Sequence, residues 1–330
     1  MAGTTNVGVV NYISNPVASF PKNSITVDIF GNVFYRAYDF GAGDDTGVYW
    51  NSEKEYSKEA MLFFAISMER SLLGKFSFGK KLRSSQSLDF KLKLPIKDGK
   101  IYFEFMESFI AELEAERIAE LEAYLLVTGL KDYTLTEEEQ KAINNIDSLK
   151  FAKYKIIDLF NVKNSGNILS RDIVENSGTT PYLCASADNN AVSSFITYDE
   201  KYLDKGNCIF IGGKTFVVTY QEKDFYSNDS HNLVLHLKNE AIKNKQTQLY
   251  LVTCINKSLG HKYSWGDSIS KTKIQTDKVS LPMHNQQPNY AAMETLISAI
   301  HKLVIKDVVL YADRKIAASK MVISKKNEPK

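Results

Sequence analysis

This sequence lacks the features that place a protein in a membrane, outside the cell or among redox proteins. It contains no run of about 18 or more apolar residues, so no membrane-spanning helix is predicted. Its N-terminal part has no basic segment followed by an apolar one, as a secretory signal would have. Cys184, Cys208 and Cys254 form no Cys-x-x-Cys pair, so we expect buried free thiols. We therefore expect a cytoplasmic protein with no membrane partner.

Motifs for catalysis are also missing. No Gly-x-Ser-x-Gly, Gly-x-Gly-x-x-Gly or Asn-Pro-Pro-Tyr segment occurs, and the histidines show no metal-binding spacing. Gly213-Lys214-Thr215 resembles the end of a phosphate-binding loop, but Cys208 stands where a glycine is needed, and residues 216–220 predict a strand. A hairpin turn is the better interpretation there, and Asp98-Gly99-Lys100 likewise predicts a turn. We predict no catalytic residue, metal or cofactor; a site assembled by the fold from distant Ser, His and Asp residues stays open as an alternative.

The charges nearly cancel, but they are segregated along the chain. The formal net charge is +2. Residues 70–100 are rich in lysine and arginine, whereas residues 104–122 are rich in glutamate. Because phosphate is attracted to cations and repelled by carboxylates, this pattern predicts that a DNA duplex would contact the basic segment.

A long internal repeat is the most informative feature that is present. Phe76-Ser77-Phe78-Gly79-Lys80 matches Tyr263-Ser264-Trp265-Gly266-Asp267 in type, 187 positions later. The same spacing relates Leu94-Pro95 to Leu281-Pro282 and Met106 to Met293. Upstream, with a slightly different offset, Asn23-Ser24 matches Asn207-Cys208 and Asp39-Phe40 matches Asp224-Phe225. Two distant copies in 330 residues predict two similar globular domains, which suit a partner with two sites.

Local patterns predict a mixed α+β fold. Residues 24–30 and 32–36 are rich in strand-forming residues and are separated by Gly31, as in a hairpin. Residues 58–73 have a helical apolar period, and residues 90–94 alternate strictly, as a half-buried strand does. Thr136 and Glu139 form a capping box for a short helix.

Each copy ends in a long amphipathic helix, one from about residue 103 to Gly129 and one from Tyr290 onward. We expect the two helices to pair as an antiparallel coiled coil; the alternative is that each covers only its own domain. The apolar residues predicted to pair are Met106, Ile110, Leu113, Leu121, Met293, Ile297, Ile300 and Val304.

These elements predict a first α/β domain over residues 1–102, a central helix and spacer over 103–150, a second domain over 151–288 and a C-terminal helix and tail over 289–330. Aligning the two copies places Met1 opposite about residue 180 of the second copy. We therefore expect the first domain to lack the segment that matches residues 151–180.

The repeated loops combine cations, hydroxyl groups and amides, which can contact phosphates and base edges. We expect Phe76, Phe78, Tyr263 and Trp265 to pack in the cores, and the polar residues of both copies to contact DNA. These predicted contacts are Arg36, Lys75, Ser77, Lys80, Lys81, Arg83, Gln86, Asn189, Asn190, Lys214, Lys262, Ser264, Ser268, Lys271 and Lys273.

The order of these segments resembles that in specificity subunits of type I restriction-modification systems and in the DNA-recognition subunits of type IIB-like systems. The resemblance rests on Thr179-Thr180-Pro181-Tyr182-Leu183-Cys184-Ala185-Ser186, followed by Asn189-Asn190 and Phe195-Ile196, with Ala191 where glycine is usual. Asn207, the strand at Ile209, Gly212, both aromatic loops and both Leu-Pro segments extend it over nearly the whole chain.

The resemblance implies two target-recognition domains that each bind one half of a bipartite double-stranded DNA site. It also implies paired helices that dock adenine-specific DNA methyltransferase subunits, an association with a nuclease or translocase subunit, and no catalytic residue on this chain. An alternative is a scaffold or adaptor whose paired helices bind proteins and whose globular parts do not touch DNA.

Overall fold

A computed structural model describes residues 2–326 of the chain, except for the side chains of residues 84, 88 and 319–326. The chain divides into two compact units: unit 1 contains Met1–Val127 and Tyr311–Lys330, and unit 2 contains Thr128–Leu310. Among the described residues, no helix has the length and apolar character needed to cross a membrane.

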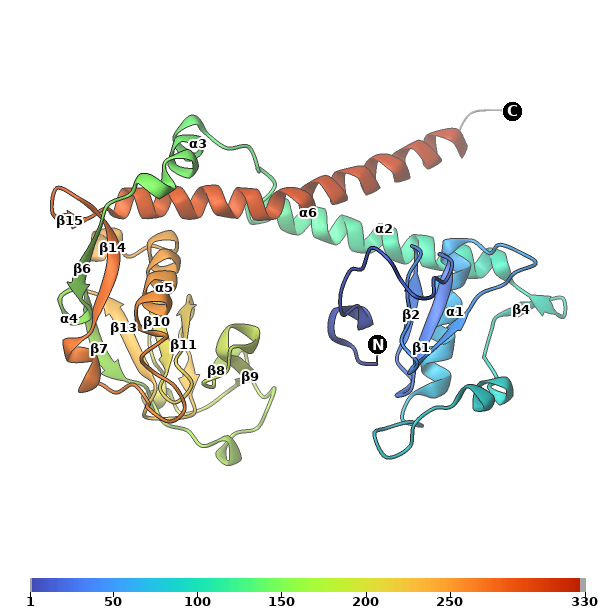
Figure 1. The fold of residues 1–330 in the computed structure, drawn as a ribbon, viewed down its shortest axis with the longest axis horizontal. Helices are drawn as coiled ribbons and strands as arrows, with labels where there is room; N and C mark the ends of the chain where they lie inside the picture. Colours follow the sequence, from blue (N-terminus) through green and yellow to red (C-terminus); the bar gives the residue numbers. More distant parts are fainter. Residues whose placement is uncertain (1, 327–330) are drawn as a thin grey trace. The chain divides into compact units, whose positions relative to one another are not determined.

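Unit 1 is built on a three-stranded antiparallel sheet backed by a helix. Its strands β1 (Ser24–Asp28), β2 (Val33–Arg36) and β3 (Thr46–Tyr49) have the order β2-β1-β3. α1 (Lys58–Leu72) packs beside β1 and β2 and contacts α2 (Phe103–Val127), as Figure 1 shows. A short hairpin, β4 (Ile96–Lys97) and β5 (Lys100–Ile101), precedes α2.

The β1–β2 hairpin forms as the sequence predicts. Gly31 has φ +86°, a conformation that glycine adopts without strain. The buried Asp28 carboxylate accepts hydrogen bonds from the backbone N–H groups of Phe30 and Asn32 at 2.8 and 2.9 Å. These hydrogen bonds to a buried carboxylate therefore stabilise the turn between the two strands.

Unit 2 has a larger sheet system. β7 (Phe160–Asn164), β10 (Cys208–Gly212), β11 (Val217–Gln221) and β13 (Leu233–Leu237) form a sheet of order β11-β10-β13-β7. α5 (Lys245–Leu259) packs against β11 and β14 (Lys278–His284), visible in Figure 1.

Two smaller sheets and three further α-helices complete this unit. One sheet contains β8 (Thr180–Leu183), β9 (Val192–Ile196) and β12 (Tyr226–Ser227), and the other contains β6 (Phe151–Lys155), β14 (Lys278–His284) and β15 (Gln287–Pro288). The helices are α3 (Glu137–Asn144), α4 (Ile156–Leu159) and α6 (Tyr290–Lys326), the last of which continues into unit 1.

The two units repeat the same arrangement, which confirms the predicted α+β fold with two similar parts. β1, β2 and α1 correspond to β10, β11 and α5, and the long helices α2 and α6 begin 187 positions apart. Asn23 and Asn207, which precede the first strand of each copy, have φ angles of 57° and 48°. Each accepts a hydrogen bond from a tyrosine hydroxyl, of Tyr35 or Tyr220. Matching residues thus make matching contacts.

The predicted strand over residues 90–94 is wrong. In unit 1 this segment is extended but lies in no sheet. Its counterpart in unit 2 belongs to β14, which forms an antiparallel ladder with β6. The alternating pattern is the same in both copies, and the partner strand decides whether it becomes a strand.

Within unit 2, the predicted apolar seam on α6 is only partly buried. The stripe buried in unit 2 is Met293, Leu296 and Ala299, with exposed fractions of 0, 1 and 0%. Ile297 is half-buried, whereas Ile300 and Val304 are 37 and 72% exposed. Polar side chains of α6, including Ser298, hold α3 on the neighbouring face.

On α2, the predicted pairing residues Met106 and Ile110 are buried, and Leu113 and Leu121 are half-buried. Within unit 1, α2 lies beside the last part of α6, where Lys315 Nζ is 3.9 Å from Glu114 Oε2. Pairing of the two helices over their length remains a prediction.

The cysteines are free, as expected. Cys208 and Cys254 are buried, and Cys184 is partly buried. Burial raises the pKa of Cys208 and of Cys254 to about 12, so neither thiol ionises near neutral pH.

Glu139 joins α3 to α6 inside unit 2. Its carboxylate accepts hydrogen bonds from Ser298 Oγ at 2.6 Å and Lys302 Nζ at 2.9 Å, and the predicted capping box with Thr136 is present. Burial by itself would raise the pKa of Glu139, but these hydrogen bonds and the charge of Lys302 lower it to about 2. The ionised carboxylate is therefore the form that holds α3 in place.

We expect Glu139→Gln to lower the free energy of unfolding by about 2 kcal/mol at pH 7, because a buried charge-assisted hydrogen bond is lost. The lowered pKa means that this stabilisation is full above the unfolded value of about 4.3 and is lost as the pH falls toward about 2. Urea denaturation at pH 7 and at successively lower pH would measure both effects. Glu137→Gln, on the same helix with a 92% exposed side chain, is the matched control and should change little. A difference from the wild type that does not shrink with falling pH would contradict the assignment.

Candidate nucleic-acid interface

The two aromatic loops of the repeat have the same backbone geometry. Each follows the C-terminus of the fifteen-residue helix of its unit, α1 or α5. Ser77 and Lys80 close the first loop with two backbone hydrogen bonds of 3.0 Å, and Ser264 and Asp267 close the second with bonds of 3.2 and 3.1 Å. Two tight turns are thus presented in equivalent places.

Only half of the predicted core aromatics lie in the core. Phe76 packs edge-on against Phe90, and Tyr263 is 3% exposed. Phe78 and Trp265, two positions further along, are 83 and 79% exposed, so the expectation of core packing was wrong for them. The physical reason is the tight turn, which directs the first aromatic inward and the second outward. The position of each outer aromatic beside Gly79 or Gly266 was the sequence signal for this difference.

A buried carboxylate fixes the second loop. Tyr263 donates its hydroxyl to Asp277 Oδ2 at 2.5 Å, and Lys262 pairs with the other oxygen of the same carboxylate. Burial and the hydrogen bond to Asp277 raise the pKa of Tyr263 to about 12. Lys262 is therefore committed to a structural ion pair.

The first loop cannot form this ion pair, because an apolar residue replaces its carboxylate. Phe90 stands at the position of Asp277, 187 positions earlier, and Lys75 stands at that of Lys262. Among the described residues, no carboxylate pairs with Lys75, Lys80, Lys81 or Arg83. All four are exposed, and the Lys81 ammonium lies 5.5 Å from the ring centroid of Phe78. Free cations can bind phosphate, and the exposed aromatic ring beside them can stack with a base.

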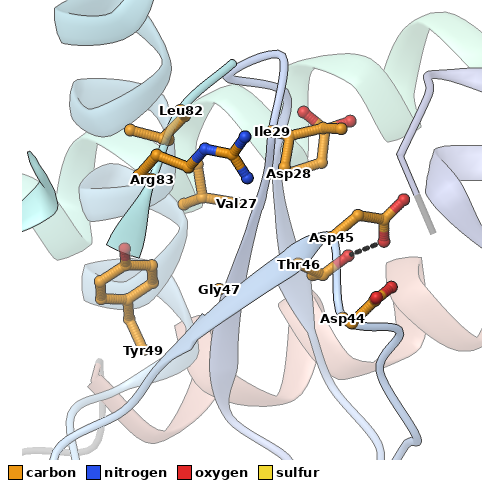
Figure 2. A pocket seen from close by; sticks show the side chains of 10 residues that line it. All are labelled: Val27, Asp28, Ile29, Asp44, Asp45, Thr46, Gly47, Tyr49, Leu82 and Arg83. Carbon is orange, nitrogen blue, oxygen red and sulfur yellow. Dashed lines mark hydrogen bonds between the residues drawn. The ribbon is translucent and has the colours of Figure 1, made fainter. Parts of the chain in front are cut away.

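Arg83 has acidic neighbours. It lines a cavity of about 200 Å³ together with Asp28, Asp44 and Asp45, as Figure 2 shows. Asp28 already accepts hydrogen bonds from backbone N–H groups, and Asp45 accepts one from the Thr46 hydroxyl at 3.2 Å. Figure 2 draws the latter as a dashed line. The carboxylates attract the Arg83 guanidinium and repel an anion inside the cavity. A phosphate would therefore contact Arg83 from the solvent side of the cavity. Gln86 is exposed, and its side-chain oxygen accepts a hydrogen bond from Arg83 N at 2.9 Å.

The polar residues of the second loop lie at its surface. Ser264 and Lys271 are exposed, and Ser268 is half-buried. Lys273 pairs with Asp267 and donates to the Ser268 carbonyl at 2.8 Å. Ser77 of the first loop is exposed, like Ser264. The second loop therefore offers hydroxyl groups and one lysine, and the first offers more free positive charge.

Two predicted contacts lie away from the loops and hold the backbone. Asn189 and Asn190 have φ angles of 46° and 53°, and their side-chain amides donate to the carbonyls of Val192 and Tyr220. In unit 1, Asn6 donates to the carbonyl of Val9 in the way that Asn189 does to Val192. Both asparagines are solvent-exposed, but their amide donors stabilise the turn.

The remaining two cations are engaged by the protein. Arg36 is 7% exposed, and its guanidinium donates to Thr26 Oγ1 and to the Val7 carbonyl. Arg36 is thus a core residue of unit 1, which corrects the expectation that it contacts DNA. Lys214 is exposed and pairs with Asp229 at 2.8 Å; although burial opposes it, hydrogen bonds from Lys214 and His231 lower the pKa of Asp229 to about 2.

The part of the chain that the structure describes contains no cluster of His, Cys, Asp and Glu side chains suited to hold a metal ion.

Comparison with known proteins gives consistent matches. A family model described as the type I restriction modification DNA specificity domain matches residues 2–123 and 149–310. The specificity subunit S.BcgI of a type II restriction enzyme from Heyndrickxia coagulans is 27% identical over 160 residues. That match covers 48% of this chain and 45% of the relative, so the chain matches less than half of the relative's length. The crystal structure of a type I restriction-modification S subunit from M. genitalium shares the fold, with a TM-score of 0.51 at 14% identity, over 92% of this chain and 82% of that chain.

The different placement of the two aromatics in each loop predicts different effects on stability. Tyr263→Ala should lower the free energy of unfolding by about 3 kcal/mol, because a buried ring is lost. Phe78→Ala and Trp265→Ala should each change it by less than about 0.5 kcal/mol, because both rings are exposed. Urea denaturation followed by circular dichroism would compare the three variants. Equal destabilisation by Trp265→Ala and Tyr263→Ala would show that Trp265 packs in a core.

Proposed function

The chain belongs to the type I restriction modification DNA specificity family, and from that premise we propose that it is a non-catalytic DNA-recognition subunit of a restriction-modification complex. In this proposal each repeated α/β part binds one half of a bipartite duplex site. Chemistry on the DNA is carried out by partner subunits, and no catalytic residue is assigned to this chain.

The observation that carries the proposal is the pair of equivalent loops with exposed aromatic tips. Phe78 and Trp265 occupy the same position of the repeat, and the side chain at this position is exposed in both copies of the loop. Cations stand beside the first, and hydroxyl groups stand beside the second. These are the groups that contact phosphates, base edges and base faces.

The proposed mechanism divides binding between the two kinds of group. Lys75, Lys80, Lys81 and Arg83 of the first loop, and Lys271 of the second, contact phosphates and supply affinity. Ser77, Gln86, Ser264 and Ser268 supply hydrogen bonds to base edges, and their differences between copies give the two half-sites different sequences. Lys214, Lys262, Lys273, Asn189 and Asn190 already have partners within the chain, so we place them in a supporting role.

We further propose that the long helices dock adenine-specific methyltransferase subunits and that a nuclease subunit joins the same complex. An apolar stripe on α6 supports the proposal, because Ile300, Leu303, Val304 and Val308 are 37, 45, 72 and 39% exposed. Apolar side chains at this helical spacing are suited to pack against a helix of another protein. The same stripe favours the second candidate function, a scaffold that binds proteins only.

A triple substitution in the first loop separates the two candidates. Lys80→Ala, Lys81→Ala and Arg83→Ala together should weaken binding to duplex DNA at least tenfold at 0.1 M salt. The slope of log K against log salt should fall by about 0.9 for each lost phosphate contact. Fluorescence anisotropy with the assembled methyltransferase complex measures both quantities. Lys141→Ala, an exposed lysine on α3, is the control; unchanged DNA binding by the triple variant would exclude this loop as a contact surface.

Exchange of residues 151–282 for the same segment of a relative should change one half of the methylated sequence and leave the other half intact. The physical reason is that unit 2 has its own core and its own loop, so its contacts transfer with it. Sequencing of methylated adenines in cells that carry the exchanged chain reports both half-sites. The proposal of one half-site per repeat fails if the methylation pattern is unchanged or if both halves change.

A further inference from the structure

Unit 1 contains an apolar groove with a basic rim. The groove has a volume of about 730 Å³ and lies between α1, the first turns of α2 and the extended segment 91–93. Its floor includes Phe63, Phe105 and Phe109, with Phe109 5.9 Å from Phe105 and 6.2 Å from Phe63 between ring centroids. Phe105 and Phe109 are 44 and 46% exposed, which is unusual for neighbouring aromatic side chains in a folded protein.

In unit 2 the counterpart of residues 91–94 is paired with another strand of the chain. There β6 forms an antiparallel ladder along β14, with Tyr154 opposite Val279 and Ala152 opposite Leu281. Tyr154 packs on the core, and the residues that follow β6 add the fully buried Ile156 and Phe160. The strand β7 then continues this segment and covers the edge of β13. Residues 151–164 thus complete the core and two sheet edges of unit 2.

The same two edges of unit 1 have no such cover within residues 2–326. Backbone groups of residues 91–94, the counterpart of β14, make no hydrogen bond to any described residue. β3, the counterpart of β13, pairs only with β1 and is an edge strand. An unpaired edge beside an apolar groove is the geometry that accepts an added strand.

The charges around the groove indicate the chemistry of that strand. Arg70, Lys75, Lys91 and Lys93 line it, all four are exposed, and none pairs with a carboxylate among the described residues. In unit 2 the register places Lys153 opposite Ser280 and Lys155 opposite Lys278. The same strand in unit 1 would place Lys153 opposite Lys93 and Lys155 opposite Lys91. Like charges directly opposite one another are unfavourable, and opposite charges are favourable.

We propose that this groove of unit 1 binds an extended acidic segment of a partner protein, which adds as a β-strand along residues 91–94. In the added strand, acidic side chains opposite Lys91 and Lys93 lie on the groove side. An aromatic side chain opposite Leu92 lies on the other face, where Tyr154 packs on the core in unit 2. The backbone groups that the added strand would pair with lie outside the two aromatic loops, and Lys75 lines the groove and is also one of the proposed phosphate contacts.

A pair of peptides tests the proposal on the full chain. The first is a synthetic peptide of residues 151–164 carrying Lys153→Glu and Lys155→Glu, and the second is the unchanged peptide. We expect the acidic peptide to bind at least tenfold more tightly than the unchanged one in fluorescence anisotropy. Hydrogen exchange of residues 91–94 should slow when the acidic peptide is added, because their N–H groups become paired.

The matched protein variant is Lys91→Glu with Lys93→Glu, which alters two exposed side chains and should leave the fold intact. We expect it to reverse the preference, with the unchanged, basic peptide bound more tightly. Failure of the acidic peptide to bind, or equal binding to both protein forms, would overturn the proposal. Slow hydrogen exchange of residues 91–94 in the absence of peptide would also overturn the proposal. If that exchange rate depends on protein concentration, a second copy of the chain occupies the groove. If it does not, the chain itself occupies the groove.

Discussion

One hydrogen-bond junction, present in both units, determines where the candidate interface lies. The side chain that caps the fifteen-residue helix accepts a hydrogen bond from that helix and also donates one to a glutamate in the first turns of the long helix. In unit 1 these bonds join Ser57 to Ala60 N and to Glu107 Oε1 at 2.6 Å. In unit 2, Asn244 binds Thr247 N and Glu294 Oε1 at 2.7 Å. The junction fixes the short helix against the long one, and the aromatic loop at the far end of the short helix is positioned as a result.

The two copies use the same backbone with different side chains, and this difference has a physical consequence. In unit 2 the Tyr263, Asp277 and Lys262 network makes the loop rigid and neutralises its lysine. In unit 1 an aromatic contact between Phe76 and Phe90 holds the equivalent place, which leaves Lys75 without an ion pair among the described residues. An apolar anchor therefore leaves cations available for a partner, and an ionic anchor consumes one. The shared scaffold thus supports two surfaces of different charge.

Polar contacts on the long helix show the same principle. Glu139, Ser298 and Lys302 form a buried network that holds α3 on α6 in unit 2. Ile300 and Val304 of the same helix are exposed. The helix is amphipathic in composition, yet the position of its buried face is set by a specific ion pair as well as by hydrophobic residues.

The sequence by itself determined the features that depend on neighbouring residues and on the repeat. The hairpin at Gly31, the helix of residues 58–73, the capping box at Thr136 and the equivalent aromatic loops were all predictable, because turn chemistry, helical period and self-similarity are local or internal to the chain. Tertiary structure alone decided the outcomes that need a distant partner. Residues 90–94 alternate like a strand but pair with no strand among the described residues. Arg36 is buried and donates hydrogen bonds to Thr26 and Val7, and Phe78 and Trp265 point outward while Phe76 and Tyr263 point inward. The hydrophobic pattern of a segment indicates which secondary structure it can form, whereas its burial depends on which other segment packs against it.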